Sequence, residues 1–162
     1  MRKIFVLAFI VLFGGSGHVL AAGGGSYSSD GGNGGSYSSV DKNPELKPAK
    51  RAISRKDYTT AMSELRAVLD QQPDNADAWN LLGYSARKTG DFSTAEAAYT
   101  KALELDPKHT QAMEYMGQMY LTLKQPEKAE KLLARLNSLC SFNCVDRDSL
   151  KAAIRDYRAS QS

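Results

Sequence analysis

The sequence predicts an all-α protein built from repeated pairs of antiparallel helices. Apolar residues recur at helical spacing from about residue 45 almost to the end of the chain. A set of large and small residues in 76–109 returns 34 residues downstream and, in part, 34 residues upstream. Pro73 and Pro107 close two of these units, because proline disfavours a helical conformation in the residue before it. Together these observations indicate helix pairs stacked so that each pair contacts its neighbours.

The central copy carries the pattern most fully. Its positions are Trp79, Leu82, Gly83, Ala86, Phe92, Ala95, Tyr99, Ala102 and Pro107. The downstream copy reproduces them as Met113, Met116, Gly117, Tyr120, Pro126, Ala129, Leu133 and Leu136. The upstream copy retains Ala49, Ala52, Tyr58, Ala61, Leu65, Val68 and Pro73.

This pattern resembles the tetratricopeptide repeat, or TPR. The resemblance implies a right-handed superhelix of about three helix pairs, at 42–75, 76–109 and 110–143, within a repeat region of 42–145. It also implies a C-terminal capping helix at 146–159, with Leu150, Ala153, Ile154 and Tyr157 on its inner stripe. The alternative for that stripe is a free amphipathic helix that awaits a partner. Function is then expected to be the binding of a protein or peptide rather than catalysis.

The first 41 residues differ from the repeats. Arg2 and Lys3 precede a short apolar run and the small residues Ala21 and Ala22, which is the pattern of a secretory signal peptide over 1–22. The apolar run is too short to cross a bilayer, so we expect a periplasmic or secreted protein without stable membrane insertion. Residues 23–41 are rich in Gly and Ser and contain GGSYSS twice, which predicts a disordered linker.

Helices are predicted at 45–55, 58–71, 75–89, 92–105, 109–123, 126–139 and 146–159. Asp57 and Asp91 are suited to cap two of them through their side-chain oxygens. Gly90 can adopt the positive φ that ends a helix, and Pro126 fits a first turn.

Gly83 and Gly117 would each cost about 1 kcal/mol in an ordinary helix. Their recurrence at the repeat period predicts instead that the two helices of a pair approach closely there. Ala95 and Ala129 are the expected small counterparts on the second helices. Trp79, Leu82, Tyr99 and Leu103 are expected to fill the space around the crossing.

The TPR resemblance places a ligand groove on the first helices of the pairs. The positions that it implies are Lys50, Asp77, Asn80, Tyr84, Arg87, Lys88, Gln111, Glu114 and Gln118, with Ile53 and Ser54 beside them. Glu114 and Gln118 depart from the arrangement that clamps a C-terminal carboxylate in some TPR domains. We therefore expect a polar peptide with Tyr84 as its anchor. The alternative is a solvated surface and a partner that binds elsewhere.

No catalytic constellation accompanies the repeats in the sequence. His109 has no nucleophile or carboxylate partner in a known motif, and we expect it to be a turn residue facing solvent, with no cofactor bound. Met113, Met116 and Met119 have a spacing that could bind Cu(I), but two of them occupy core slots of the repeat, so packing is favoured.

Cys140 and Cys144 are the chain's two cysteines, and export would place them in an oxidising compartment. A structural disulfide is the favoured interpretation, ahead of free thiols and of a metal or redox site.

The net charge of the whole chain is +3, and it falls to +1 without residues 1–22. Basic and acidic residues alternate along the predicted helices, which argues against nucleic-acid binding. Two function classes remain: an exported adaptor, scaffold or assembly factor, and a structural module that self-associates through its repeat ends. A metal- or thiol-linked carrier is a third and weaker one.

Overall fold

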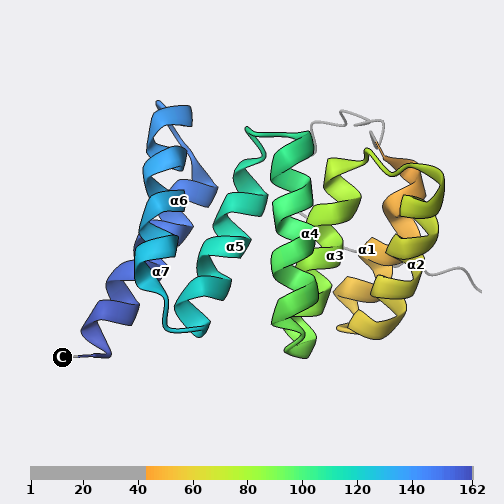
Figure 1. Cartoon of the computed structure of the whole chain (residues 1–162), viewed down its shortest axis with the longest axis horizontal. Coiled ribbons are helices and arrows are strands. Elements are labelled where there is room, and N and C mark those ends of the chain that lie inside the picture. The colour runs from red at the N-terminus through yellow and green to blue at the C-terminus, as the bar shows by residue number, and fades with distance from the viewer. Residues whose placement is uncertain (1–42, 162) are drawn as a thin grey trace, which may run out of the picture. The chain divides into compact units, whose positions relative to one another are not determined.

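The computed structural model describes residues 43–161, which all belong to one compact unit. A 3-10 turn, η1 (Pro44–Leu46), leads into seven α-helices (Figure 1). These are α1 (Lys47–Ser54), α2 (Tyr58–Gln71), α3 (Ala76–Thr89), α4 (Phe92–Leu105), α5 (Thr110–Thr122), α6 (Pro126–Leu139) and α7 (Val145–Ala159). No strand occurs within the described range, and the all-α prediction is confirmed. The predicted signal peptide and linker lie outside the described residues.

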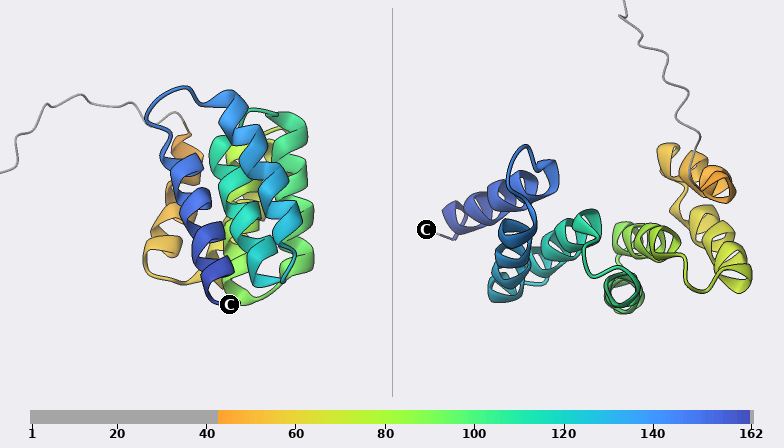
Figure 2. Two further views of the ribbon diagram at one scale, coloured as in Figure 1. Left: turned by 90° about the vertical axis from the view of Figure 1, so that its left-hand side faces the viewer. Right: turned by 90° about the horizontal axis from the view of Figure 1, so that it is seen from above.

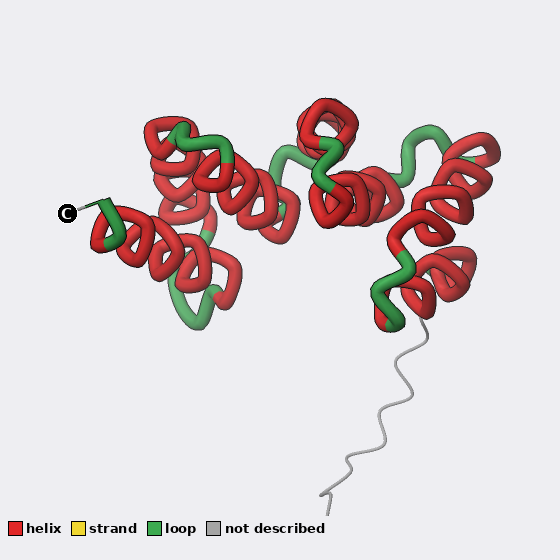
Figure 3. The backbone as a smooth tube through the Cα atoms, turned by 90° about the horizontal axis from the view of Figure 1, so that it is seen from below, coloured by secondary structure: helices red, strands yellow, loops and turns green. Residues whose placement is uncertain are grey.

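The helices form an arc of antiparallel pairs, α1–α2, α3–α4 and α5–α6, with α7 added at the end (Figure 2). Seen along the helix axes, the first helix of each pair and α7 line the inner side of the arc. The second helices, α2, α4 and α6, form its outer side, as the view from below also shows (Figure 3). The inner side is called the concave face here, and the outer side the convex face.

Side-chain oxygens cap the N-terminal ends of α2 and α4, as the sequence predicts. Asp57 accepts a hydrogen bond from the Thr60 amide and Asp91 from the Thr94 amide, both at 3.1 Å. These bonds lower the pKa of both carboxyl groups. Gly90 ends α3 with a φ of 85°, a conformation that is costly for residues with a Cβ.

His109 is not the solvent-facing turn residue expected from the sequence. Its Nδ1 accepts a hydrogen bond from the Ala112 amide at 3.2 Å and so caps α5. Its Nε2 lies 3.1 Å from Asp77 Oδ1 on α3. Because Nδ1 accepts, Nε2 carries the hydrogen that is donated to Asp77. The side chain therefore joins two concave helices.

Two clusters of buried side chains form one core along the arc. The first lies between α1 and α4, and the second extends from α3 to α7. Met62 and Trp79 pack against both clusters and connect them. Met113, Met116 and Met119 lie inside the second cluster, which is where the packing interpretation places them.

The predicted close crossing at Gly83 exists, but its counterpart is Tyr99 rather than Ala95. A Cβ added at Gly83 would lie 2.7 Å from Tyr99 Cδ1. Tyr99 is fully buried on α4, so its ring cannot move away. Because Gly83 has no side chain, the backbone of α3 can lie directly against the ring of Tyr99 on α4.

Gly117 makes room for a different helix from the one expected. The three atoms nearest to a Cβ at this position belong to Leu150 of α7, with Cδ1 at 2.6 Å, and not to Ala129 of α6. Leu150 is fully buried and Ile154 nearly so, while Ala153 and Tyr157 pack at the edge of the core. The apolar stripe of α7 therefore covers the last helix pair, as a capping helix does.

A short loop turns the chain from α6 into α7. The sulfur atoms of Cys140 and Cys144 are at bonding distance, with Cα atoms 5.7 Å apart, as the predicted structural disulfide requires. Arg147 Nη1 donates to the Cys140 carbonyl at 3.2 Å across the loop. Phe142 and Val145 stand out of it with 90% and 79% of their surface exposed.

We predict that Gly83→Ala destabilises the protein. Alanine favours an isolated helix by about 1 kcal/mol over glycine, but here its methyl group would overlap the Tyr99 ring. Overpacking of this kind costs about 1–3 kcal/mol, so urea unfolding should give a lower free energy of unfolding for the variant. In a Tyr99→Leu background the penalty should shrink. An equal effect of Gly83→Ala in both backgrounds would show that Tyr99 is not the obstacle.

A concave face with an aromatic centre

The residues expected to hold a partner come from α1, α3 and α5, which line the concave face (Figure 2). The structure separates them into two groups. Some bond to one another across neighbouring helices, and others present their side chains outward. Lys50 lies exposed on α1, with Ile53 half-buried and Ser54 exposed near it.

Two hydrogen bonds join α3 to α5 along this face. Asn80 Nδ2 donates to Gln111 Oε1 at 2.8 Å, and Arg87 Nη1 donates to Gln118 Oε1 at 3.1 Å. Both pairs are separated by 31 residues. Asn80 is only 1% exposed, which corrects its expected role as a ligand contact. Its amide fixes the spacing of the two helices instead.

Glu114 extends this network from α5 to α7. It accepts hydrogen bonds from Gln118 Nε2 and, at 2.7 Å, from Ser149 Oγ. It is 3% exposed, so it too is a packing residue and not the surface residue expected. Burial raises the pKa of its carboxyl group, against the effects of these bonds and of Arg87, and Asp146 raises it further.

Asp77 is occupied at the N-terminal end of α3. Besides His109, it accepts a hydrogen bond from the Asn43 side chain, which comes from the start of the described chain. At the corresponding end of α5, Thr110 Oγ1 donates to Asp146 Oδ2 of α7 at 2.6 Å. Polar contacts therefore tie the concave helices together along the edge of the face where α3 and α5 begin.

Three tyrosines form the centre of the concave face. The ring centroids of Tyr84 on α3 and Tyr115 on α5 are 4.9 Å apart, and Tyr58 at the start of α2 packs edge-on against Tyr84 at 6.1 Å. All three side chains are half-buried. Of the three, only Tyr84 is among the binding residues expected from the sequence. The offset between Tyr84 and Tyr115 is the same 31 residues as between Asn80 and Gln111, which differs from the 34-residue period of the sequence, so the repeat pattern gave no signal for Tyr115.

Two cations accompany the rings. The Arg87 guanidinium lies 5.6 Å from the centroids of both Tyr84 and Tyr115, and Lys88 Nζ lies 5.8 Å from that of Tyr84. Arg87 is held by Gln118, whereas Lys88 is exposed. Burial raises the pKa of the phenol groups of Tyr84 and Tyr115, so both remain neutral hydrogen-bonding groups at neutral pH. We call Tyr58, Tyr84, Tyr115, Arg87 and Lys88 the tyrosine cluster.

The chemistry that these residues offer is binding. Aromatic faces stack on apolar or planar groups, and an exposed ammonium group donates hydrogen bonds to a carbonyl or carboxylate. Within residues 43–161 no three His, Cys, Asp or Glu side chains gather in a way that would hold a metal ion. Nor does any helix in this range combine the length and apolar character that crossing a membrane takes.

Residues 44–161 match the sequence profile of a family described as the cytochrome c-type biogenesis protein H TPR domain. The chain belongs to this family of TPR domains. The TPR resemblance of the sequence is thereby confirmed, and TPR domains are typically protein-interaction modules.

Related TPR regions occur in much longer proteins. The chain is 32% identical over 117 residues to DnaJ protein P58IPK homolog A of Oryza sativa subsp. japonica, a match over 72% of this chain and 22% of that protein. It is 28% identical over 117 residues to protein FlbA of Caulobacter vibrioides, again over 72% of this chain but 20% of the relative. With tetratricopeptide repeat protein 37 of Xenopus laevis, the identity is 34% over 87 residues, which is 54% of this chain and 6% of that protein.

Solved TPR structures share the fold. The P58(IPK) TPR domain superposes with a TM-score of 0.62 at 19% identity, over 72% of this chain and 32% of that one. A chain of the CopN-Scc3 complex superposes with a TM-score of 0.59 at 25% identity, over 70% of this chain and 66% of the other. Both structures therefore share the helix arrangement of this chain.

We predict that Glu114→Gln changes how stability depends on pH. The folded-state pKa of Glu114 lies above its ordinary value of 4.5, so the folded protein holds this proton to higher pH than the unfolded chain does. The contribution of Glu114 to the free energy of unfolding is therefore greatest below pH 4.5. It is lost as the pH rises through the folded-state pKa. Glutamine can accept the same two hydrogen bonds without charge.

Relative to the wild type, the Gln variant should therefore gain stability as the pH rises from 4.5 through the folded-state pKa of Glu114, measured by urea unfolding at a series of pH values. Glu64→Gln, at an exposed position of α2, is the matched control. A stability difference that does not change over this pH range would contradict a buried and ionisable Glu114.

Proposed function

We propose that this protein is an exported, non-catalytic TPR module that holds a polypeptide partner along its concave face. The observation that carries the proposal is the tyrosine cluster. The tilted rings of Tyr84 and Tyr115 pack against each other on this face, Lys88 is exposed beside them, and the neighbouring polar residues already bond to one another. The cluster is the part of the face left available to a partner.

The cluster suits a segment with a bulky side chain and nearby oxygen acceptors. A planar or apolar group of the partner would lie against Tyr84 and Tyr115, and Lys88 would bond to a carbonyl or carboxylate. Interface hot spots are enriched in Tyr and Arg and surrounded by residues that exclude water. Because Arg87 is already fixed by Gln118, little side-chain entropy would be lost when a partner binds there.

The family's description suggests an assembly role in the biogenesis of c-type cytochromes. A c-type cytochrome polypeptide is therefore the first partner to test. We propose no cofactor and no nucleic-acid partner, since the module would act by holding another protein.

A second candidate function is self-association through the disulfide loop. Phe142 and Val145 are apolar and almost fully exposed at the α6–α7 junction. Contiguous exposed apolar groups commonly mark contact surfaces. In this alternative the partner is a second copy of the chain, and contact occurs at the end of the arc rather than at its centre.

Export remains a proposal that rests on residues 1–22. We predict that mass analysis of the protein purified from its native source finds a chain that begins near Ala22 or Gly23. The protein should then be in the periplasm or the medium. A chain that retains Met1 in the membrane fraction would contradict export by a cleaved signal.

The concave-face proposal predicts where a partner crosslinks. A photo-crosslinking amino acid at position 84 should capture a partner polypeptide in living cells, with a c-type cytochrome polypeptide expected by mass spectrometry. The same amino acid at position 142 is the matched control. Crosslinks to a second copy from position 142, with none from position 84, would favour self-association instead.

Tyr84→Ala combined with Lys88→Glu should weaken binding of the captured partner about thirtyfold, since loss of a hot spot commonly costs about 2 kcal/mol. Calorimetric titration measures the affinity, and circular dichroism should show unchanged helicity. Phe142→Ala combined with Lys47→Glu removes an exposed ring and reverses a charge elsewhere, and it should leave the affinity unchanged. The opposite pattern would place the partner away from the tyrosine cluster.

A further inference from the structure

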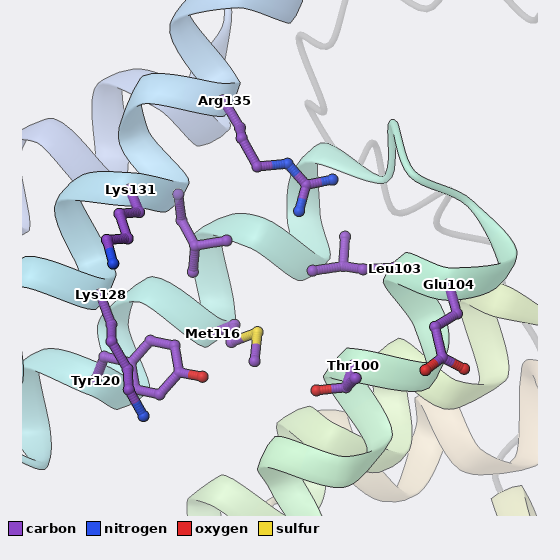
Figure 4. Close-up of a pocket in the computed structure, with 9 residues that line it drawn as sticks. Thr100, Leu103, Glu104, Met116, Tyr120, Lys128, Lys131 and Arg135 are labelled. Atoms are coloured by element: carbon purple, nitrogen blue, oxygen red, sulfur yellow. The ribbon is translucent and has the colours of Figure 1, made fainter.

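A groove opens on the convex face between α4 and α6, with α5 as its floor (Figure 4). Its volume is about 430 Å³. Met116 and Tyr120 of α5, Leu103 of α4 and Leu132 of α6 give it an apolar base. Figure 4 shows Met116 at the base, between Leu103 and the ring of Tyr120. We call this opening the outer groove.

A row of cations borders the outer groove on the α6 side. Lys128, Lys131 and Arg135 are three and four residues apart, so they share one narrow face of the helix. The row spans about 10 Å along α6, at 1.5 Å per residue. A single carboxylate or phosphate is shorter than this row. Several acidic groups in succession match its length.

The three cations differ in how many interactions they make with other groups of the protein. Lys128 Nζ lies 3.6 Å from Glu96 Oε1 and 4.6 Å from the Tyr120 ring centroid. Arg135 Nη2 donates to the Pro107 carbonyl at 3.0 Å. Lys131 is exposed and has no interaction partner among residues 43–161.

The acids on the opposite wall pair with this row only at Lys128. Glu96 already accepts a hydrogen bond from the Tyr120 hydroxyl at 2.7 Å and faces Lys128, while Glu104 pairs with Lys101 of its own helix at 3.3 Å. The groove therefore has a cationic edge, an apolar base and a second edge with acidic groups. An anionic bilayer would be repelled by that second edge, whereas a helix can carry different charges on its two sides.

We propose that the outer groove binds an amphipathic helix of a partner protein whose acidic residues follow an i, i+3, i+7 row. The carboxylates lie along Lys128, Lys131 and Arg135, and apolar side chains beside them contact Met116 and Leu103. Exposed ion pairs contribute little affinity, so the apolar base supplies most of the binding and the cation row selects the partner. This site lies on the face opposite to the tyrosine cluster and does not depend on it.

A synthetic peptide tests this proposal with the full chain. The probe is a fluorescent amphipathic helix with Glu at i, i+3 and i+7 and Leu one residue after each Glu. Fluorescence anisotropy should show saturable binding, about tenfold weaker for Lys131→Glu and unchanged for Lys47→Glu, at an exposed position of α1 outside both proposed sites. A peptide with Gln in place of Glu should also bind more weakly. Equal affinities of the wild type and the Lys131→Glu variant would overturn the proposal.

Methionine methyl resonances locate the peptide independently of charge. Binding should shift the Met116 signal and leave those of Met113 and Met119, which are fully buried elsewhere in the core, in place. Thr100→Trp, at an exposed position on the groove wall, should block binding without unfolding the protein. No shift of Met116 at saturation would overturn the proposal. So would Lys131-dependent binding to phosphatidylglycerol vesicles without binding to the peptide.

Discussion

The close contact between glycine and a large buried side chain is the constraint on which this fold depends. At Gly83 the backbone of α3 lies against the Tyr99 ring of α4, and at Gly117 the backbone of α5 lies against Leu150 of α7. The first contact sets the distance within a helix pair, and the second seats the capping helix. A Cβ at either glycine would overlap the neighbouring side chain. The two glycines therefore allow α3 to pack closely on α4, and α5 on α7.

Polar contacts then fix the concave helices laterally. Asn80, Arg87 and Glu114 are joined to partners on neighbouring helices, and burial of Glu114 is unfavourable enough to raise its pKa. This network uses side chains that would otherwise face a ligand. The residues left over, chiefly Tyr84 and Tyr115, therefore give the face its binding character. On the convex side, Lys128 and Arg135 bond to other groups of the protein. Lys131 has no such partner among the described residues and lies beside the apolar base of the outer groove.

The helices and their core were predictable because each follows from local spacing. Caps at Asp57 and Asp91, the turn at Gly90 and the small residue at Gly83 act within one helix pair. Contacts between pairs were not predictable from the 34-residue repeat, since neighbouring concave helices meet at an offset of 31. This shift explains the burial of Asn80 and the absence of Tyr115 from the expected site. Likewise, nothing in the repeat pattern indicated that Gly117 faces α7.

Fluorine NMR of 3-fluorotyrosine-labelled protein tests most directly whether a partner binds over the tyrosine cluster. The chain has eight tyrosines, of which the fully buried Tyr99 is an internal reference and Tyr120 reports on the outer groove. On titration with the partner captured from position 84, the resonances of Tyr84 and Tyr115 should shift together while those of Tyr99 and Tyr120 stay in place. Shifts at Tyr120 without change at Tyr84 and Tyr115 would place the partner on the convex side and contradict the concave-face account.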